Sequence, residues 1–282
     1  LLAAHDGLTA AQFEIISITT TGDKILDRTL QAAGGKGLFT KEVEEAMLEG
    51  KADLAVHSMK DMPDQMPSGL VIDCLLPRAD PRDALVSLTH TSLADLPPGT
   101  VVGTASLRRQ ALLLKQRPDL ITVPFRGNIN TRLKKLAAGD VGATFLAMAG
   151  LERINHDMSA ATPLSLEQML PAVGQGAIGV QRRDSDDRMA RLLAAINCPA
   201  TTKAVAAERA MLSVLDGSCR TPIAGFAALS NNHEELWLRG SITHPMGSLH
   251  VEEEIRGPSQ EAKALGETLG KRLEPKLASI LK

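Results

Sequence analysis

The sequence predicts an α/β protein: two doubly wound α/β domains followed by a small α+β domain. Over the first two thirds of the chain, short β-forming runs alternate with helical patterns, which is typical of sheets covered by helices. Beyond Pro199 the pattern changes to one helix, three strand-like runs and a final helix. The length of 282 residues also exceeds that of most single domains.

Prolines divide the chain into three blocks, with linkers at 77–81 and 170–171. In the first block we expect strands at 13–18, 53–57 and 70–76 and a helix at 40–48 capped by Thr40. In the second we expect strands at 101–103, 120–124 and 143–147 and helices at 106–115 and 128–138. Because strands alternate with helices in these two blocks, their sheets are predicted to be parallel. In the third block we expect helices at 202–215 and 259–281 and antiparallel strands at 223–229, 235–243 and 249–255.

Composition excludes several classes of protein. Hydrophobic residues make up 44% and charged residues 23%, as in ordinary globular proteins. Aromatic residues reach only 2% and the net charge is -2, which argues against a nucleic-acid binder. Three widely spaced cysteines predict neither a disulfide framework nor a metal site and favour a reducing, cytoplasmic setting. No apolar run is long enough for a membrane span.

Basic residues gather where predicted strands end and helices begin. Four such turns are GGKG at 34–37, TASLRR at 104–109, FRGNINTR at 125–132 and AGLER at 149–153. Helix N-termini attract anions, and arginine adds paired donors suited to carboxylates or phosphates. A single arginine of this kind is more often a solvated surface side chain. Four turns in series favour a small polyanionic ligand.

Two further segments carry candidate chemistry. Asp61 follows a predicted strand beside Lys60, and we expect its carboxylate to be charged and able to stabilise a cationic intermediate. A turn-forming aspartate before Pro63 would look the same, and His57 is interpreted as structural. Cys219 lies in a Gly/Ser loop beside Arg220, where a thiol can be exposed and easily ionised. An incidental loop cysteine also fits that pattern.

Taken together, these segments resemble the porphobilinogen deaminase (hydroxymethylbilane synthase) family. The matching stretches, in family order between about residues 20 and 225, are GGKGLFTKEVE, ADLAVHSMKDMP, DPRDALVS, VGTASLRRQ, FRGNINTRLKKL, LAMAGLERI, LPAVGQGAIGV, AAERAM and DGSCRTPIAG. The resemblance implies two domains of periplasmic-binding-protein type with the active site between them, and a third domain. The implied boundaries are 1–76 with 177–194, 82–170, and 199–282.

The resemblance also implies a reaction and a site. Four porphobilinogen molecules would be condensed head to tail, with loss of ammonia, on a dipyrromethane cofactor joined to Cys219 by a thioether, and hydroxymethylbilane would then be released by water. Asp61 matches the catalytic aspartate, and no metal is implied. The positions matched to the cofactor's contacts are Ser58, Lys60, Thr104, Ser106, Arg108, Arg109 and Gly150. Those matched to the substrate or the growing chain are Lys36, Phe39, Arg126, Arg132, Arg153 and Gln175.

Other interpretations stay open at this point. A non-enzymatic protein that captures an anion could share the two-domain scaffold, but it would need neither Asp61 nor Cys219. A pyridoxal-phosphate or nucleotide enzyme, with Lys60 as a Schiff-base lysine, is a weaker alternative. Family members also carry a segment of the type R-x-S-x-L-A-L-x-Q, which does not precede Leu1. A protein truly without this segment is expected to have poor activity and to fail to load its cofactor. A monomer is expected.

Overall fold

The computed structural model describes residues 8–20, 40–63, 66–154, 157–215 and 221–280. Its strands are β1 (Leu54–Ser58), β2 (Leu70–Leu75), β3 (Asp83–Val86), β4 (Val101–Gly103), β5 (Ile121–Val123), β6 (Ala143–Ala147), β7 (Ala161–Pro163), β8 (Ile178–Arg183), β9 (Ile223–Leu229), β10 (Glu235–Thr243) and β11 (His250–Pro258). Its α-helices are α3 (Lys41–Leu48), α4 (Leu107–Gln116), α5 (Ile129–Ala137), α6 (Met148–Arg153), α7 (Asp187–Ala194), α8 (Pro199–Val214) and α9 (Ala262–Ile280). Its 3-10 turns are η1 (Ala10–Gln12), η2 (Met59–Asp61), η3 (Met158–Ala160) and η4 (Ser259–Glu261). Among these described helices, none combines the length and apolar character that a membrane span requires.

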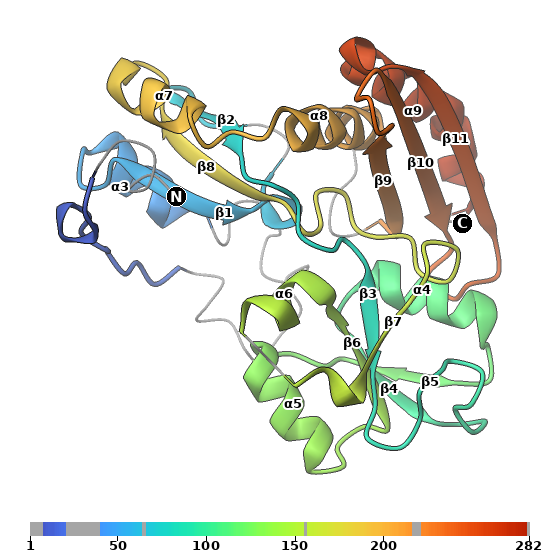
Figure 1. Ribbon diagram of the computed structural model, residues 1–282. Helices are drawn as coiled ribbons and strands as arrows, with labels where there is room; N and C mark the ends of the chain where they lie inside the picture. The colour runs from blue at the N-terminus through green and yellow to red at the C-terminus, as the bar shows by residue number, and fades with distance from the viewer. Residues whose placement is uncertain (1–7, 21–39, 64–65, 155–156, 216–220, 281–282) are drawn as a thin grey trace.

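The described strands form three sheets, which occupy separate parts of the molecule (Figure 1). The first has the order β1-β8-β2, the second β5-β4-β6-β3-β7, and the third β11-β10-β9. In the first sheet, β8 pairs antiparallel with both neighbours, although it follows the whole second sheet in the chain. The chain therefore crosses from the first sheet to the second and returns.

The α/β class with a C-terminal antiparallel sheet and helices is confirmed, but the expected parallel pairing is only partly right. Parallel pairs join β4 to β5 and β6, whereas β3 pairs antiparallel with β6 and β7. In the first sheet both pairs are antiparallel. There the chain comes back from the second sheet, so β8 runs in the direction opposite to β1 and β2. The short strands β3, β7 and β8 and the helix α7 were not predicted.

One local expectation is wrong, and another is only partly right. Residues 13–18 form no strand in the structure, and their apolar side chains are largely exposed, with Ile15 at 93%. Apolar alternation alone does not hold a strand when no described neighbour supplies ladder hydrogen bonds. Thr40 does occupy the N-cap position of α3, but its side chain accepts no capping hydrogen bond. Ser106 and Asn128, by contrast, cap α4 and α5 through their side chains.

The two crossing segments, 76–82 and 164–177, are bonded to each other. The Ala79 amide donates to the Gly176 carbonyl over 3.2 Å, and the Gln175 side chain donates to the Pro81 carbonyl over 2.8 Å. Gly176 has φ +85°, and a Cβ there would lie 2.6 Å from the Ala79 carbonyl oxygen. Only glycine fits this position, because other residues would meet both the strained φ and the clash.

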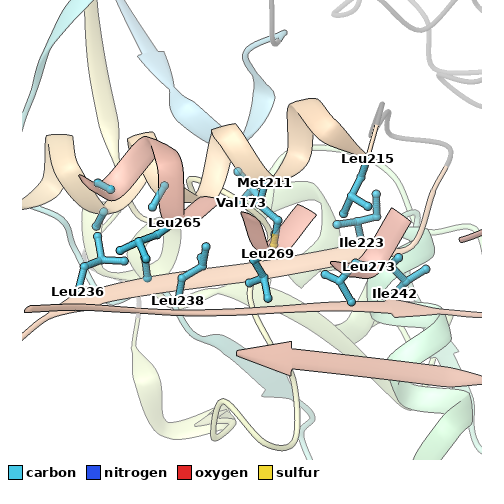
Figure 2. Close-up of a cluster of buried hydrophobic side chains, with 14 of the residues drawn as sticks. Val173, Met211, Leu215, Ile223, Leu236, Leu238, Ile242, Leu265, Leu269 and Leu273 are labelled. Atoms are coloured by element: carbon cyan, nitrogen blue, oxygen red, sulfur yellow. The ribbon is translucent and has the colours of Figure 1, made fainter. Parts of the chain in front are cut away.

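The third sheet is covered on one side by α8 and α9. Figure 2 shows Met211, Leu269 and Leu273 between these helices and the strands, with Leu269 near Leu238 and Leu273 near Ile242. All five side chains are fully buried. Val173, from the returning crossing, joins this core, so the third sheet is packed against the segment that links the first two.

Candidate active site

Lys60 and Asp61 lie in η2, directly after the end of β1. Lys60 is half-buried, and its Nζ donates to Oε1 of Gln175 over 3.5 Å. Burial and the nearby Arg109 charge lower the pKa of Lys60 to about 8, although Asp61 and Asp83 oppose this shift. Asp61 itself is exposed, so its carboxylate is open to a ligand.

Arg108 and Arg109, in the first turn of α4, converge on the buried carboxylate of Asp83. Arg108 donates to Oδ2 over 2.7 Å and Arg109 to Oδ1 over 2.7 Å. Both arginines are less than 10% exposed, and Asp83 is 0% exposed. Burial alone would raise the pKa of Asp83, but the two guanidinium groups outweigh that effect and hold it well below its usual range.

The two arginines are buried rather than solvated at the surface. Arg108 also donates to the Leu170 carbonyl and Arg109 to the Phe145 carbonyl, so most of each guanidinium group is engaged inside the protein. Within the described residues, Nε of Arg108 is buried and has no hydrogen-bond partner. A buried N–H without a partner is costly, and a ligand oxygen could satisfy it.

Arg132, with Arg126 close to it, lies near Arg109, and Arg153 contacts the segment that returns to the first sheet. Arg132 on α5 donates to the Gly127 carbonyl over 2.9 Å, and burial followed by the charges of Arg109 and Arg126 lowers its pKa to about 10. Arg153 on α6 is exposed and donates to the Gly176 carbonyl over 3.1 Å. The cations that act on Lys60 or Arg132 are Arg108, Arg109 and Arg126, whereas the carboxylates among the described residues that act on them are Asp61 and Asp83. The excess of positive charge favours binding of a ligand with several carboxylates.

The small predicted site residues have local roles in the fold. Thr104 Oγ1 accepts from the Ser106 amide over 3.1 Å, and Ser106 Oγ accepts from the Arg109 amide over 3.4 Å, which fixes the first turn of α4. Gly150 lets α6 approach α5, since a Cβ there would lie 2.8 Å from Cδ1 of Ile129. Ser58 ends β1 and lies beside Asp61 at a cavity.

That cavity, of about 260 Å³, adjoins the end of β1. Its described lining residues are Thr40, Val56, His57, Ser58, Asp61 and Met62. His57 has the structural role expected of it, because its Nε2 lies 2.8 Å from Oε1 of the buried Gln181 and burial lowers its pKa. No group of metal-ligating side chains occurs in the part of the chain that the structure describes.

The structure brings together residues from the first sheet, the second sheet and the segment 164–177 that links them: Lys60, Arg108, Arg109, Arg132 and Gln175. Three predicted residues, Lys36, Phe39 and Cys219, lie outside the described residues. Gln175 is 1% exposed and donates to Asp83 Oδ1 over 2.9 Å, so it joins the site from within rather than lining its surface.

Sequence reasoning missed the buried acids that organise this region. Asp83 stands in the quoted stretch DPRDALVS but was not singled out, because its partners lie 25 and 26 positions downstream. Glu208 was also missed. It is fully buried and accepts from Arg78, from the Gly174 amide and from the Ala227 amide. The one local signal for Glu208 is its place among alanines in a helical pattern, AAERA at 206–210.

Solved structures that resemble the chain include two periplasmic proteins. The chain matches the periplasmic VFT2 domain of BvgS from Bordetella pertussis with a TM-score of 0.39 and 18% identity, over 69% of this chain and 72% of that one. It matches an ABC-transporter periplasmic substrate-binding protein from Coxiella burnetii with a TM-score of 0.38 and 18% identity, over 61% of this chain and 81% of that one. At these scores, the description of the fold rests on the strand order given above.

Sequence comparison is decisive for the family. Residues 2–191 match the family model for the porphobilinogen deaminase dipyromethane cofactor binding domain, and residues 202–275 match the porphobilinogen deaminase C-terminal domain. The chain is 54% identical to porphobilinogen deaminase of Paracoccus denitrificans (strain Pd 1222), over 97% of this chain and 86% of that protein. It is 52% identical to the chloroplastic porphobilinogen deaminase of Oryza sativa subsp. japonica, over 92% of this chain and 72% of that protein. This chain belongs to the porphobilinogen deaminase family.

Proposed function

We propose that this chain is a transferase that joins porphobilinogen units head to tail, with loss of ammonia, in tetrapyrrole biosynthesis. Family membership carries the activity and the dipyrromethane cofactor. The structural observation that best supports the proposed site is the meeting of Lys60, from one side of the crossing, with Arg109 and Arg132, from the other. The substrate's acetate and propionate groups require such cations.

The described residues fit a bound group with several carboxylates. Lys60 and Arg132 have pKa values lowered in part by neighbouring cations, and the buried Nε of Arg108 has no partner within the described residues. When bound, the cofactor supplies the pyrrole carbon to which the first substrate unit is joined. We assign its acidic groups to Lys60, Arg108 and Arg109, with Ser58, Thr104, Ser106 and Gly150 beside them. Its attachment is assigned to Cys219, outside the described residues.

The substrate side of the site is assigned to Arg126, Arg132 and Arg153, with Lys36 and Phe39 from outside the described residues. Gln175 supports this side from within. Asp61 is the proposed catalytic residue. When the aminomethyl group leaves, positive charge spreads over the substrate's pyrrole ring and its N–H. An exposed, fixed carboxylate that accepts a hydrogen bond from that N–H stabilises the charge and lowers the barrier.

Asp61→Asn tests this role, because it keeps the size of the side chain and removes its charge. We expect the rate of ammonia release from porphobilinogen to fall by about a hundred-fold or more. Asp53→Asn is the matched control, since Asp53 is exposed and, within the described residues, its one ion pair is with Arg183, at the opposite end of β1 from Ser58. A wild-type rate in Asp61→Asn would remove Asp61 from the mechanism. Binding of porphobilinogen without release of ammonia by the wild type would favour an anion-binding protein.

Three coarser proposals accompany the function. The three sheets support domains at 1–76 with 177–194, 82–170, and 199–282. Cys74 and Cys198 are free thiols in the described structure, as a cytoplasmic protein would have. We also propose a monomer, which light scattering in solution would test.

A further inference from the structure

Gln175 forms a bridge between the two sides of the site. Its Nε2 donates to the Pro81 carbonyl over 2.8 Å and to Asp83 Oδ1 over 2.9 Å, while its Oε1 accepts from Lys60 over 3.5 Å. Its backbone is held as well, since its amide donates to the Ala172 carbonyl and its carbonyl accepts from Arg78. A side chain that is 1% exposed and bonded at every polar atom has little freedom to turn.

The partners fix the direction of this amide. The Pro81 carbonyl and the ionised Asp83 carboxylate can only accept hydrogen bonds, so both must face the NH₂ group of Gln175. Oε1 therefore points toward Lys60, and only a donor suits that position. A negative charge at Asp83 thus orients an acceptor toward an ammonium group that follows β1 of the first sheet.

The same carboxylate orients two cations of the second sheet. Asp83 receives Arg108 at Oδ2 and Arg109 and Gln175 at Oδ1. The charges of Lys60 and Arg109 repel each other, and the charge of Arg109 helps to lower the pKa of Lys60. Without a bound anion, the like charges of Lys60 and the two arginines favour separation of these groups. The hydrogen bonds of Asp83 and Gln175 offset that repulsion and hold the cations where one carboxylate can contact several of them.

We propose that Asp83, acting through Gln175, is a positioning residue that holds Lys60 together with Arg108 and Arg109 as one carboxylate-binding set across the crossing. This inference rests on the proposed function for the identity of the ligand, a pyrrole bearing acetate and propionate groups. The arrangement of the cations themselves does not depend on that function. It can therefore be measured without substrate on the Cys219→Ser chain, in which no cofactor is attached to occupy the three cations.

The test uses the Cys219→Ser chain, alone and with Asp83→Asn or Gln175→Leu added, and follows acetylation of Lys60 over a pH series by mass spectrometry of the Lys60 peptide. In Cys219→Ser alone the reactivity should rise around pH 8, in line with a pKa of about 8. In Asp83→Asn the ammonium loses a stabilising negative charge. In Gln175→Leu it loses an oriented acceptor, while Asp83 keeps both arginines. Both variants should shift the midpoint downward by about one pH unit, so that Lys60 reacts several-fold faster at pH 7.

A kinetic measurement separates positioning from simple support of the fold. In Gln175→Leu, KM for porphobilinogen should rise about ten-fold while the circular dichroism spectrum stays that of the wild type. Asp53→Asn should leave the Lys60 profile unchanged, because the ion pair of Asp53 among the described residues is with Arg183 and does not involve Lys60. An unaltered Lys60 profile in both Asp83→Asn and folded Gln175→Leu would overturn the proposal. If the wild type lacks deaminase activity, the proposed function fails. The acetylation experiment still decides whether Asp83 and Gln175 position Lys60.

Discussion

Glu208→Gln should destabilise the protein strongly, because Glu208 ties the third sheet to both crossings. Its Oε1 accepts from Arg78 over 2.5 Å and from the Ala227 amide over 2.8 Å. Its Oε2 accepts from Arg78 over 3.2 Å and from the Gly174 amide over 2.7 Å. Glutamine replaces one of these oxygens with an NH₂ group. Whichever way the amide turns, that NH₂ then faces two donors, one of them the Arg78 guanidinium.

The size of the effect follows from burial. Glu208 is 0% exposed and the Arg78 side chain 11%, so the substitution leaves a cation in the interior without its counter-charge. Breaking a buried pair in this way costs about 3–5 kcal/mol. Domains are stable by only about 5–15 kcal/mol, so the loss should be a large fraction of the total.

Urea denaturation, followed by circular dichroism and by the fluorescence of Trp237 in β10, measures this loss. Glu167→Gln is the matched control, since Glu167 also pairs with an arginine, Arg239, but its side chain is 71% exposed. The control should denature at the wild-type midpoint, because exposed pairs contribute little. A free energy of unfolding for Glu208→Gln within about 1 kcal/mol of the wild type would refute the reasoning, because a buried guanidinium without its counter-charge should destabilise the fold by more than that.

Three other predictions concern the second and third sheets and the site. Gly247→Ala should lower the melting temperature, because Gly247 has φ +74° and a Cβ there would lie 2.2 Å from the Lys115 backbone nitrogen. Differential scanning calorimetry, with Gly50→Ala (φ +72°, no atom within 4 Å of the Cβ) as control, separates the clash from the strain. Because the pKa of Asp83 is held below its unfolded value of about 3.9, its ion pairs stabilise the fold at neutral pH. The stability difference between wild type and Asp83→Asn should shrink as pH falls below about 4, and a constant difference would contradict this assignment. Lys60 loses its charge as pH rises through about 8, so loading of the cofactor onto the cofactor-free chain, followed by intact-protein mass spectrometry, should slow there in the wild type but not in Lys60→Arg.

The sequence predicted the elements whose local chemistry is self-contained. Ser106, with a helical pattern after it, predicted α4, and the alternation at 223–229 and 235–243 predicted β9 and β10. The pattern could not show that β8 returns to the first sheet and pairs antiparallel, since pairing depends on the path of the chain. It also could not show that residues 13–18 lack a partner strand in the described structure.

The site was predictable in its residue types more than in its arrangement. Basic residues at helix starts indicated an anion site, and Arg108, Arg109 and Arg132 do come together. Burial of Arg108 and Arg109 against Asp83 was not predictable, because it depends on β3 lying beside β6 under the first turn of α4. Asp83 carries no local signature of its burial, and its partners are distant in sequence. The roles assigned to the individual site residues stay predictions.

Intact-protein mass spectrometry of the purified chain, beside a Cys219→Ser variant, tests the central claim most directly. The account predicts a wild-type mass that exceeds the chain by two linked pyrrole units, and no such excess in the variant. An excess that survives in Cys219→Ser would place the attachment elsewhere. A wild-type chain that releases ammonia from porphobilinogen yet carries no adduct would contradict the cofactor-dependent mechanism.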